Sequence, residues 1–191
     1  MTAEPIGDVV WTPDPVKQRL AGYTVEDVFK LPDDAPRVEL VDGVLLVVPS
    51  PTGGHQRINV RLVAWLERNL PESFESLLAV GVAVDYRNTL EPDAVILRSP
   101  VDLDHHFYTP DQVVVAIEIV SPGTKRRDRL EKPQLYAETG VPHYWRIEQN
   151  PVHIFGYDLV KGRYELVADS ADEFVLSAPF DLRLPIREIT P

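Results

Sequence analysis

The sequence predicts a single mixed α/β (α+β) domain in which helices pack on a central mixed β-sheet. Three observations indicate this class: a β-hairpin pattern at residues 37–48, a continuous apolar run of strand length at 113–120, and helical spacing at 55–70 and 130–139. At 191 residues the chain is long enough to bury a core of its own. We expect a loose arm at residues 1–21 and one domain at residues 22–191.

The first segment has little regular pattern. Residues 1–21 are rich in proline and acids and show no periodicity, which is typical of a loose arm. Thr24, followed three residues later by Asp27, predicts the start of a short helix that ends near Pro32.

The hairpin is the clearest local signal. In RVELVDGVLLVV, the pair Asp42-Gly43 separates two β-rich runs, and this pair is favoured in a two-residue type I′ turn. That turn sets Glu39 opposite Leu46. The following PSPTGG, residues 49–54, predicts a loop.

A long helix is predicted from about His55 to Leu70 and stops before Pro71. The positions that repeat with helical spacing are Ile58, Leu62, Trp65, Leu66 and Asn69.

Strands and one more helix are predicted after residue 76. We expect strands at 77–86, 92–97 and 113–120, with an exposed connection at 98–112. A helix at 130–139 ends at Gly140. The last expected strands cover 143–148, 152–157 and 163–167, with a turn at Lys161-Gly162.

Composition narrows the class of function. Thirty acids against nineteen bases give a net charge of −11, which opposes long-range attraction to nucleic acid without excluding a local basic site. The absence of cysteine excludes disulfides and thiolate chemistry and suits a reducing, cytoplasmic location. No signal peptide is visible and no apolar run approaches the ~20 residues needed to span a membrane, so no membrane association is expected.

Glu118 lies inside the apolar run VVVAIEIV. Strand alternation predicts that Val114, Ala116, Glu118 and Val120 share one face, and that Val113, Val115, Ile117 and Ile119 share the other. An ionised carboxylate in a covered layer needs a cation, a metal or a proton, because an unpaired one costs several kcal/mol or so.

Two other acids pose the same problem. Asp93 follows Pro92 at a strand start, and Glu39 lies in a β-rich run. Three acids in separate apolar segments suggest one shared site, because hard divalent cations prefer carboxylate oxygens. Lys132 is the candidate basic partner, since it shares a helix face with Asp128, Leu135, Tyr136 and Thr139.

Each of these residues also has a structural interpretation. Glu118 could be an ion-pair partner, Asp93 could cap a turn, and Glu39 could lie on the exposed face of an edge hairpin. The basic run 125–129 could be a solvated helix start, and Pro133 indicates that the helix begins or kinks there.

Several motifs together resemble one family. VELVDG, PSPTGGHQRI, Pro92-Asp93, EIVSPGTKRRDRLEK with Tyr136, and GVPHYWRIE are similar to the Uma-two family of restriction-endonuclease-like proteins, within the PD-(D/E)xK nuclease superfamily. The resemblance covers about Val25 to Leu166, and the stretch from Glu118 to Trp145 is its most specific part.

The resemblance implies a restriction-endonuclease-like fold and a set of catalytic residues. Asp93 matches the first catalytic acid, Glu118 the second, and Glu39 an early acid that the superfamily often draws from a helix. The superfamily lysine would fall at Val120 and is absent, and Lys132 matches its substitute from the following helix.

The implied activity is metal-dependent hydrolysis of DNA phosphodiester bonds. Asp93, Glu118 and the carbonyl of Ile119 would bind Mg²⁺ or Mn²⁺. Residues expected to contact the nucleic acid by local, salt-sensitive interactions are His55, Arg57, Arg126 and Arg127. His55 has the alternative role of capping or packing the helix start.

Two other functions stay open. The missing lysine and the acidic surface favour a nuclease-fold binding or assembly protein without catalysis, and the same metal site could hydrolyse another phosphoester. A homodimer is expected from the resemblance and from four late aromatic residues, Tyr144, Trp145, Phe155 and Tyr157. The alternative is that these aromatics close the core of one chain.

Overall fold

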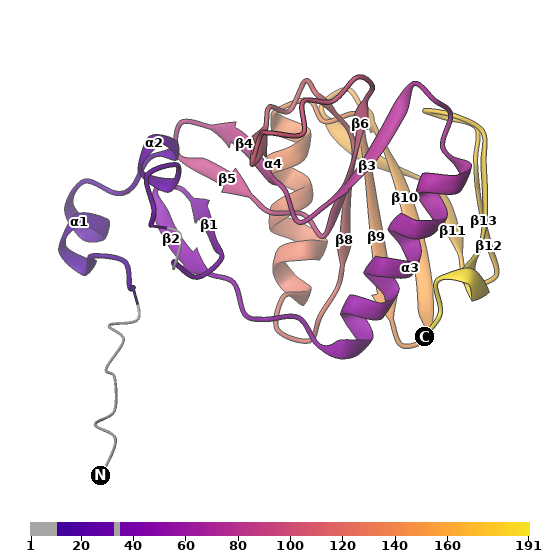
Figure 1. Ribbon diagram of the computed structural model, residues 1–191, viewed down its shortest axis with the longest axis horizontal. Coiled ribbons are helices and arrows are strands. Elements are labelled where there is room, and N and C mark those ends of the chain that lie inside the picture. Colours follow the sequence, from indigo (N-terminus) through magenta and orange to yellow (C-terminus); the bar gives the residue numbers. More distant parts are fainter. Residues whose placement is uncertain (1–10, 33–34) are drawn as a thin grey trace, which may run out of the picture.

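The computed structural model describes residues 11–32 and 35–191. Two lobes lie side by side (Figure 1). The larger lobe has a six-stranded sheet with a helix on each face, and the smaller lobe, near the N-terminus, is built on a five-stranded sheet. The predicted class, a mixed sheet flanked by helices with an N-terminal hairpin, is confirmed.

The six-stranded sheet has the order β11-β10-β9-β8-β6-β3. Only the β8–β9 pair is parallel within it, and the other described pairs are antiparallel. Its strands are β3 (Phe74–Leu78), β6 (Ala94–Arg98), β8 (Val113–Ile119), β9 (His143–Gln149), β10 (Val152–Val160) and β11 (Arg163–Ser170).

Two helices cover this sheet. α3 (Gly53–Asn69) begins two residues before the predicted start, after a cap by Thr52, and packs Ile58, Leu62 and Leu66 on one face. On the other face a π-helical turn (Arg127–Glu131) leads into α4 (Lys132–Glu138), so the helix starts earlier than predicted. Pro133 lies at that junction, where a missing N–H and a bulky ring disfavour a regular α-helical turn.

The smaller sheet has the order β2-β1-β5-β4-β7. Glu39 pairs with Leu46, and positive φ angles of 49° at Asp42 and 80° at Gly43 fit the predicted type I′ turn. Its strands are β1 (Val38–Val41), β2 (Val44–Val47), β4 (Gly81–Asp85), β5 (Asn88–Leu90) and β7 (Phe107–Tyr108).

The N-terminal segment is more regular than predicted. Asp14 caps a short helix, α1 (Pro15–Leu20), by accepting two backbone N–H bonds, so residues 15–20 are not a loose arm. The part of the predicted arm at residues 1–10 lies outside the described residues. Thr24 and Asp27 form the predicted capping box of α2 (Val25–Val28).

Two strand predictions need correction. The expected strand 77–86 is two strands in different sheets, because the chain turns at Ala79, where φ is 48°. Consequently β4 does not belong to the central sheet. The expected exposed connection 98–112 contains β7, which pairs with β4 and buries Tyr108.

The alternation predicted for β8 fails at one end. The β6–β8 register pairs Ile96 with Val115 and Leu97 with Val113, so Val114 is an extra residue. Val113 therefore shares the cluster of Ala116, while Val114 packs on the α3 side. From Val115 onward the predicted faces hold.

The C-terminal hairpin, β12 (Glu173–Leu176) and β13 (Leu182–Pro185), was not predicted, and neither was the following 3-10 turn η2 (Ile186–Glu188). Phe174 of this hairpin meets the ring of Trp145 edge-on in the core. Tyr144 and Trp145 are each 1% exposed, so they close the core of one chain and do not support the aromatic argument for a dimer. Within the described residues, no helix has the length and apolarity to cross a membrane.

Candidate active site

The start of β6 and the end of β8 bring Asp93 and Glu118 together. In the antiparallel pair, Ala94 is opposite Ile117, so the next residue on each strand places Asp93 beside Glu118. The N–H of Ile119 donates a hydrogen bond of 2.7 Å to Asp93 Oδ2. The two acids that sequence reasoning singled out therefore share one edge of the sheet.

His55 holds Asp93 from the other side. Its Nε2 lies 3.1 Å from Asp93 Oδ2, and because an ionised carboxylate only accepts, Nε2 carries the proton. Thr52 caps the helix by accepting from the backbone N–H of His55, which places His55 in the first turn of α3. Asn59, one turn later, donates to the Asp93 carbonyl at 2.9 Å. The His55 ring is buried, and its hydrogen bond to Asp93 orients the carboxylate.

Glu118 is 2% exposed and fully hydrogen-bonded. Lys132 Nζ donates to its two oxygens at 2.7 and 2.8 Å, and the Tyr136 hydroxyl donates at 3.2 Å. Burial raises the pKa of Glu118 well above its ordinary value, and the ammonium of Lys132 only partly offsets this effect. The carboxylate predicted to need a compensating charge has found it in Lys132.

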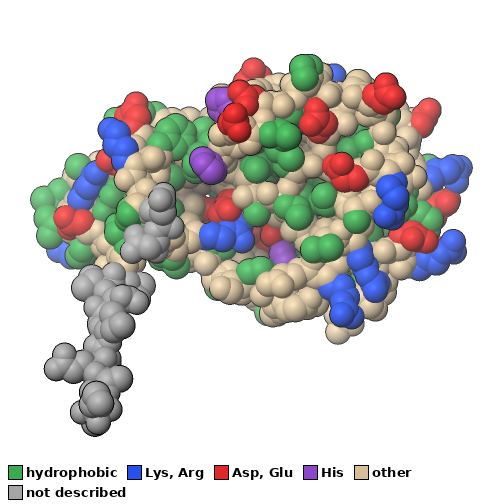
Figure 2. Space-filling view, viewed as in Figure 1, with side chains coloured by type: hydrophobic (Ala, Val, Ile, Leu, Met, Phe, Trp, Pro, Cys, Tyr) green, Lys and Arg blue, Asp and Glu red, His purple; other side chains and the backbone are tan. Residues whose placement is uncertain are grey.

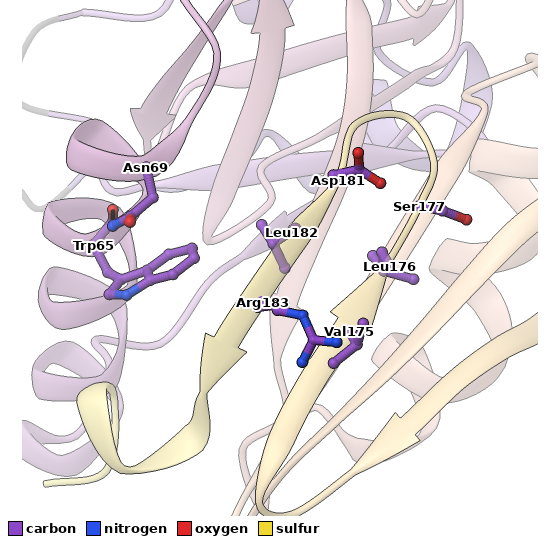
Figure 3. Close-up of a pocket in the computed structure, with 8 residues that line it drawn as sticks. All are labelled: Trp65, Asn69, Val175, Leu176, Ser177, Asp181, Leu182 and Arg183. Carbon is purple, nitrogen blue, oxygen red and sulfur yellow. Dashed lines mark hydrogen bonds between the residues drawn. The ribbon is translucent and has the colours of Figure 1, made fainter.

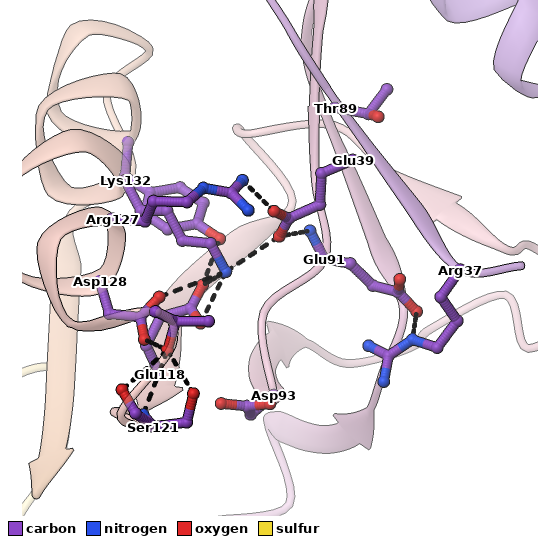
Figure 4. A network of polar contacts seen from close by, with 12 residues as sticks. Arg37, Glu39, Thr89, Glu91, Asp93, Glu118, Ser121, Arg127, Asp128 and Lys132 are labelled. Atoms are coloured by element: carbon purple, nitrogen blue, oxygen red, sulfur yellow. Dashed lines mark hydrogen bonds and ion pairs between the residues drawn. The ribbon is translucent and has the colours of Figure 1, made fainter. Parts of the chain in front are cut away.

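Lys132 is surrounded by acids. Besides Glu118, Glu39 Oε1 lies 2.9 Å from the Nζ and Asp128 Oδ1 lies at 3.8 Å (Figure 4). Burial alone would lower the pKa of Lys132, but these three carboxylates outweigh burial and raise it. Lys132 therefore stays an ammonium and acts as a hydrogen-bond donor.

Glu39 is a second buried carboxylate that contacts Lys132. It pairs with Arg127 and Lys132 and accepts from the Glu91 N–H at 3.2 Å. Burial would raise its pKa, yet the charges of Lys132 and Arg127 lower it. Glu39 is 1% exposed and does not line the cavity, so its position is that of a residue that holds Lys132.

A cavity of about 330 Å³ opens onto these groups. Figure 2 shows acidic and basic side chains with a histidine in the hollow near the middle of this face. Four acids and two bases line the cavity, which gives a formal charge of −2 with histidine neutral. The charged lining residues are Glu91, Asp93, Glu118, Asp128, Arg37 and Lys132.

Asp128 is a site residue that sequence reasoning did not select. It is 2% exposed, lines the cavity, and accepts through Oδ2 from the Thr124 hydroxyl. Its Oδ1 has no hydrogen-bond partner. Burial raises its pKa, and Lys132 only partly offsets the effect. The i, i+4 spacing to Lys132 was the signal that could have identified it.

The predicted substrate-binding arginines differ in their placement. Arg57 is exposed on α3, and Arg126 is exposed while its Nε lies 3.0 Å from Glu131. Arg127 is mostly covered and pairs with Glu39, so its guanidinium is engaged within the protein. The prediction that Arg127 contacts nucleic acid stays a prediction, and in this structure its charge is paired with a buried carboxylate.

A larger cavity, of about 720 Å³, lies between the end of α3 and the β12–β13 hairpin (Figure 3). Its lining contains one acid, Asp181, and one base, Arg183, which pairs with Glu173 at 2.7 Å. It therefore lacks the converging carboxylates of the smaller cavity.

The smaller cavity fits a magnesium-type ion. Across the described residues, no three His, Asp or Glu side chains converge closely enough to hold a metal alone. Mg²⁺ is commonly bound by one or two carboxylates and keeps several waters, so Asp93, Glu118 and a backbone carbonyl suffice. The N–H of Ile119 points at Asp93, and its carbonyl faces the same side of the extended strand. The cavity's formal charge of −2 matches a divalent cation.

Comparisons with known proteins identify the family and the fold. The model of the Uma2 family, described as "Putative restriction endonuclease", matches residues 25–187. A solved structure from Anabaena variabilis, described as "a putative nuclease belonging to DUF820", superposes with a TM-score of 0.70 at 20% identity, over 87% of this chain and 96% of that one. At this identity the likeness shows the fold. No curated protein matches the chain.

Proposed function

We propose that this chain, which belongs to the Uma2 family, is a nuclease that hydrolyses phosphodiester bonds of DNA with the help of Mg²⁺ or Mn²⁺. The observation that carries the proposal is the convergence of Asp93, Glu118 and Lys132 on one cavity at the edge of the central sheet. Of these three side chains, that of Asp93 is the most exposed, at 17%.

Asp93, Glu118 and the carbonyl of Ile119 would hold the ion. Bound there, Mg²⁺ or Mn²⁺ would lower the pKa of a coordinated water and polarise a phosphoryl oxygen. The Ile119 N–H and His55 fix the Asp93 carboxylate in place, so its geometry is set before substrate arrives.

Lys132 supplies a fixed positive charge. Because its pKa is raised, it does not serve as a base; its positive charge offsets the negative charge that develops on a phosphoryl oxygen. Glu39 is then a positioning residue, since it holds Lys132 at 2.9 Å without reaching the cavity. This departs from a direct catalytic role for Glu39.

Exposed arginines would contact the nucleic-acid backbone. Arg57 and Arg126 are exposed, lie two residues along the chain from His55 and Asp128 respectively, and do not pair with a buried carboxylate, so they suit local, salt-sensitive phosphate contacts. A homodimer would bring together two such sites, as cleavage of both strands by one assembly requires.

A second candidate is a nuclease-fold binding protein without catalysis. One observation favours it: Lys132 Nζ bonds both oxygens of Glu118, so the pair is already compensated without a metal. On this alternative the chain binds no divalent ion in the cavity.

An activity screen separates the candidates. The wild-type chain and Asp93→Ala are incubated with Mn²⁺ and with supercoiled DNA, single-stranded DNA, RNA or nucleotide phosphoesters. We expect DNA cleavage by the wild type that is lost in the variant. Hydrolysis of only another phosphoester would change the substrate class. If nothing is cleaved and calorimetry detects no Mn²⁺ binding, the nuclease proposal fails in favour of the binding protein.

A further inference from the structure

We propose that Asp128 is a positioning residue that accepts the ammonium of Lys132 when Glu118 gives a carboxylate oxygen to a divalent cation. This inference rests on the proposed metal-dependent function and adds to it a defined rearrangement of the site.

The ammonium of Lys132 is saturated in the present arrangement. An ammonium has three N–H donors, and three carboxylate oxygens lie within 2.9 Å of Nζ: two from Glu118 and one from Glu39. Asp128 Oδ1 lies at 3.8 Å, outside hydrogen-bond distance, and has no other partner. A buried carboxylate oxygen left without a donor is unfavourable and needs an explanation.

Cation binding would change which oxygens accept hydrogen bonds from Lys132. Both Glu118 oxygens face Lys132, so a cation that takes one of them frees one N–H of the ammonium. Asp128 Oδ1 is the unsatisfied acceptor nearby, and a shift of about 1 Å would bring the Nζ from 3.8 Å to hydrogen-bond distance. The exchange keeps Lys132 in the site and satisfies the orphan oxygen at the same time.

Two hydrogen bonds hold Asp128 in position to accept from Lys132. Thr124 donates to its Oδ2, and the Tyr144 hydroxyl donates to its backbone carbonyl at 2.5 Å. Because Asp128 and Lys132 are four residues apart on one helical segment, their side chains lie on the same face, and a movement of the lysine side chain alone can close the distance.

Calorimetric titration with Mn²⁺ tests the inference on wild type, Asp128→Asn, Lys132→Met and the double variant. We expect Asp128→Asn to weaken Mn²⁺ binding roughly tenfold, the size of one charge-assisted hydrogen bond. In the Lys132→Met background the same substitution should change nothing further, because no ammonium remains to be accepted. Glu138→Gln, the same charge change at an exposed position of α4, is the control and should bind like the wild type.

Each of the other outcomes rejects the inference, and one of them also rejects the proposed function. Equal Mn²⁺ binding by wild type and Asp128→Asn rejects the inference and leaves the proposed function standing. A tenfold loss that persists without Lys132 makes Asp128 a ligand of the ion, which also rejects it. Absence of Mn²⁺ binding by the wild type rejects the proposed function and the inference together.

A second measurement does not depend on folding of the variants. The ¹⁵N-labelled ammonium of Lys132 in the wild type is followed by NMR during titration with diamagnetic Mg²⁺. We expect its resonance to shift as the hydrogen bond moves from Glu118 to Asp128. An unchanged resonance at Mg²⁺ saturation would overturn the exchange.

Discussion

Replacing Lys132 by methionine removes an ammonium that lies among three buried carboxylates while keeping an unbranched apolar stem of similar length. Glu118 loses two hydrogen bonds, of 2.7 and 2.8 Å, and Glu39 loses an ion pair of 2.9 Å. Removing one partner of a buried ion pair costs about 3–5 kcal/mol, because the other charge is left uncompensated. For a domain of this size such a loss lowers Tm by on the order of 10 °C.

The loss should depend on pH. Burial already raises the pKa of Glu118, and without Lys132 it rises further. A carboxyl whose folded pKa is raised stabilises the fold only while it is protonated, so stability falls as pH rises from its ordinary value of 4.5 through the folded pKa. The destabilisation of Lys132→Met relative to wild type should therefore be smallest near pH 4–5 and grow as the pH rises.

Urea unfolding followed by tryptophan fluorescence measures both effects, since Trp65 and Trp145 are buried in the core of the larger lobe. Lys125→Met, at an exposed position, is the matched control and should leave stability unchanged. Mn²⁺ should restore part of the loss in Lys132→Met, because its charge replaces the ammonium. A loss under about 1 kcal/mol at pH 8, or one independent of pH, would refute the reasoning.

The remaining predictions concern metal binding and assembly. Asp93→Ala should abolish Mn²⁺ binding and change stability by only about 1 kcal/mol, because relief of repulsion offsets the lost Ile119 hydrogen bond; calorimetric binding equal to wild type would contradict this. Mn²⁺ affinity should increase as pH rises above the ordinary glutamate pKa, since the raised pKa of Glu118 means that the ion competes with a proton; titrations at several pH values check it, and a flat profile argues against Glu118 as a ligand. Light scattering should give twice the chain mass of 21.5 kDa, because cleavage of both strands by one assembly requires two sites, whereas a single mass would reject the homodimer.

Most of the fold was predictable from local sequence patterns. The Asp42-Gly43 turn, the Thr24 capping box and the apolar run of β8 depend on neighbouring residues, and each was predictable. The break at Ala79 was not, because a positive φ at alanine is imposed by the two sheets that β3 and β4 join. The C-terminal hairpin was missed for a similar reason: Phe174 is defined by its packing on Trp145, far away in sequence.

The site was predictable as a set of residues but not as a network. Buried acids in apolar strands predicted that Asp93, Glu118 and Lys132 meet, because each needs compensation. The partners of Glu39 depend on the pairing of β1 with β5 in the smaller sheet: Leu40 pairs with Thr89, and Asp93 follows three residues after the end of β5, where the chain enters the larger sheet. Asp128 was hidden in a run of basic residues that has the composition of a solvated surface.

A crystal structure grown with Mn²⁺ and measured at the manganese absorption edge tests the central claim most directly. We predict an anomalous peak in the cavity, coordinated by Asp93, Glu118 and the carbonyl of Ile119, with Lys132 displaced from one oxygen of Glu118. The absence of a peak at Mn²⁺ concentrations that saturate related carboxylate sites, with Lys132 still bonded to both oxygens, would contradict the account and leave the pair a structural one.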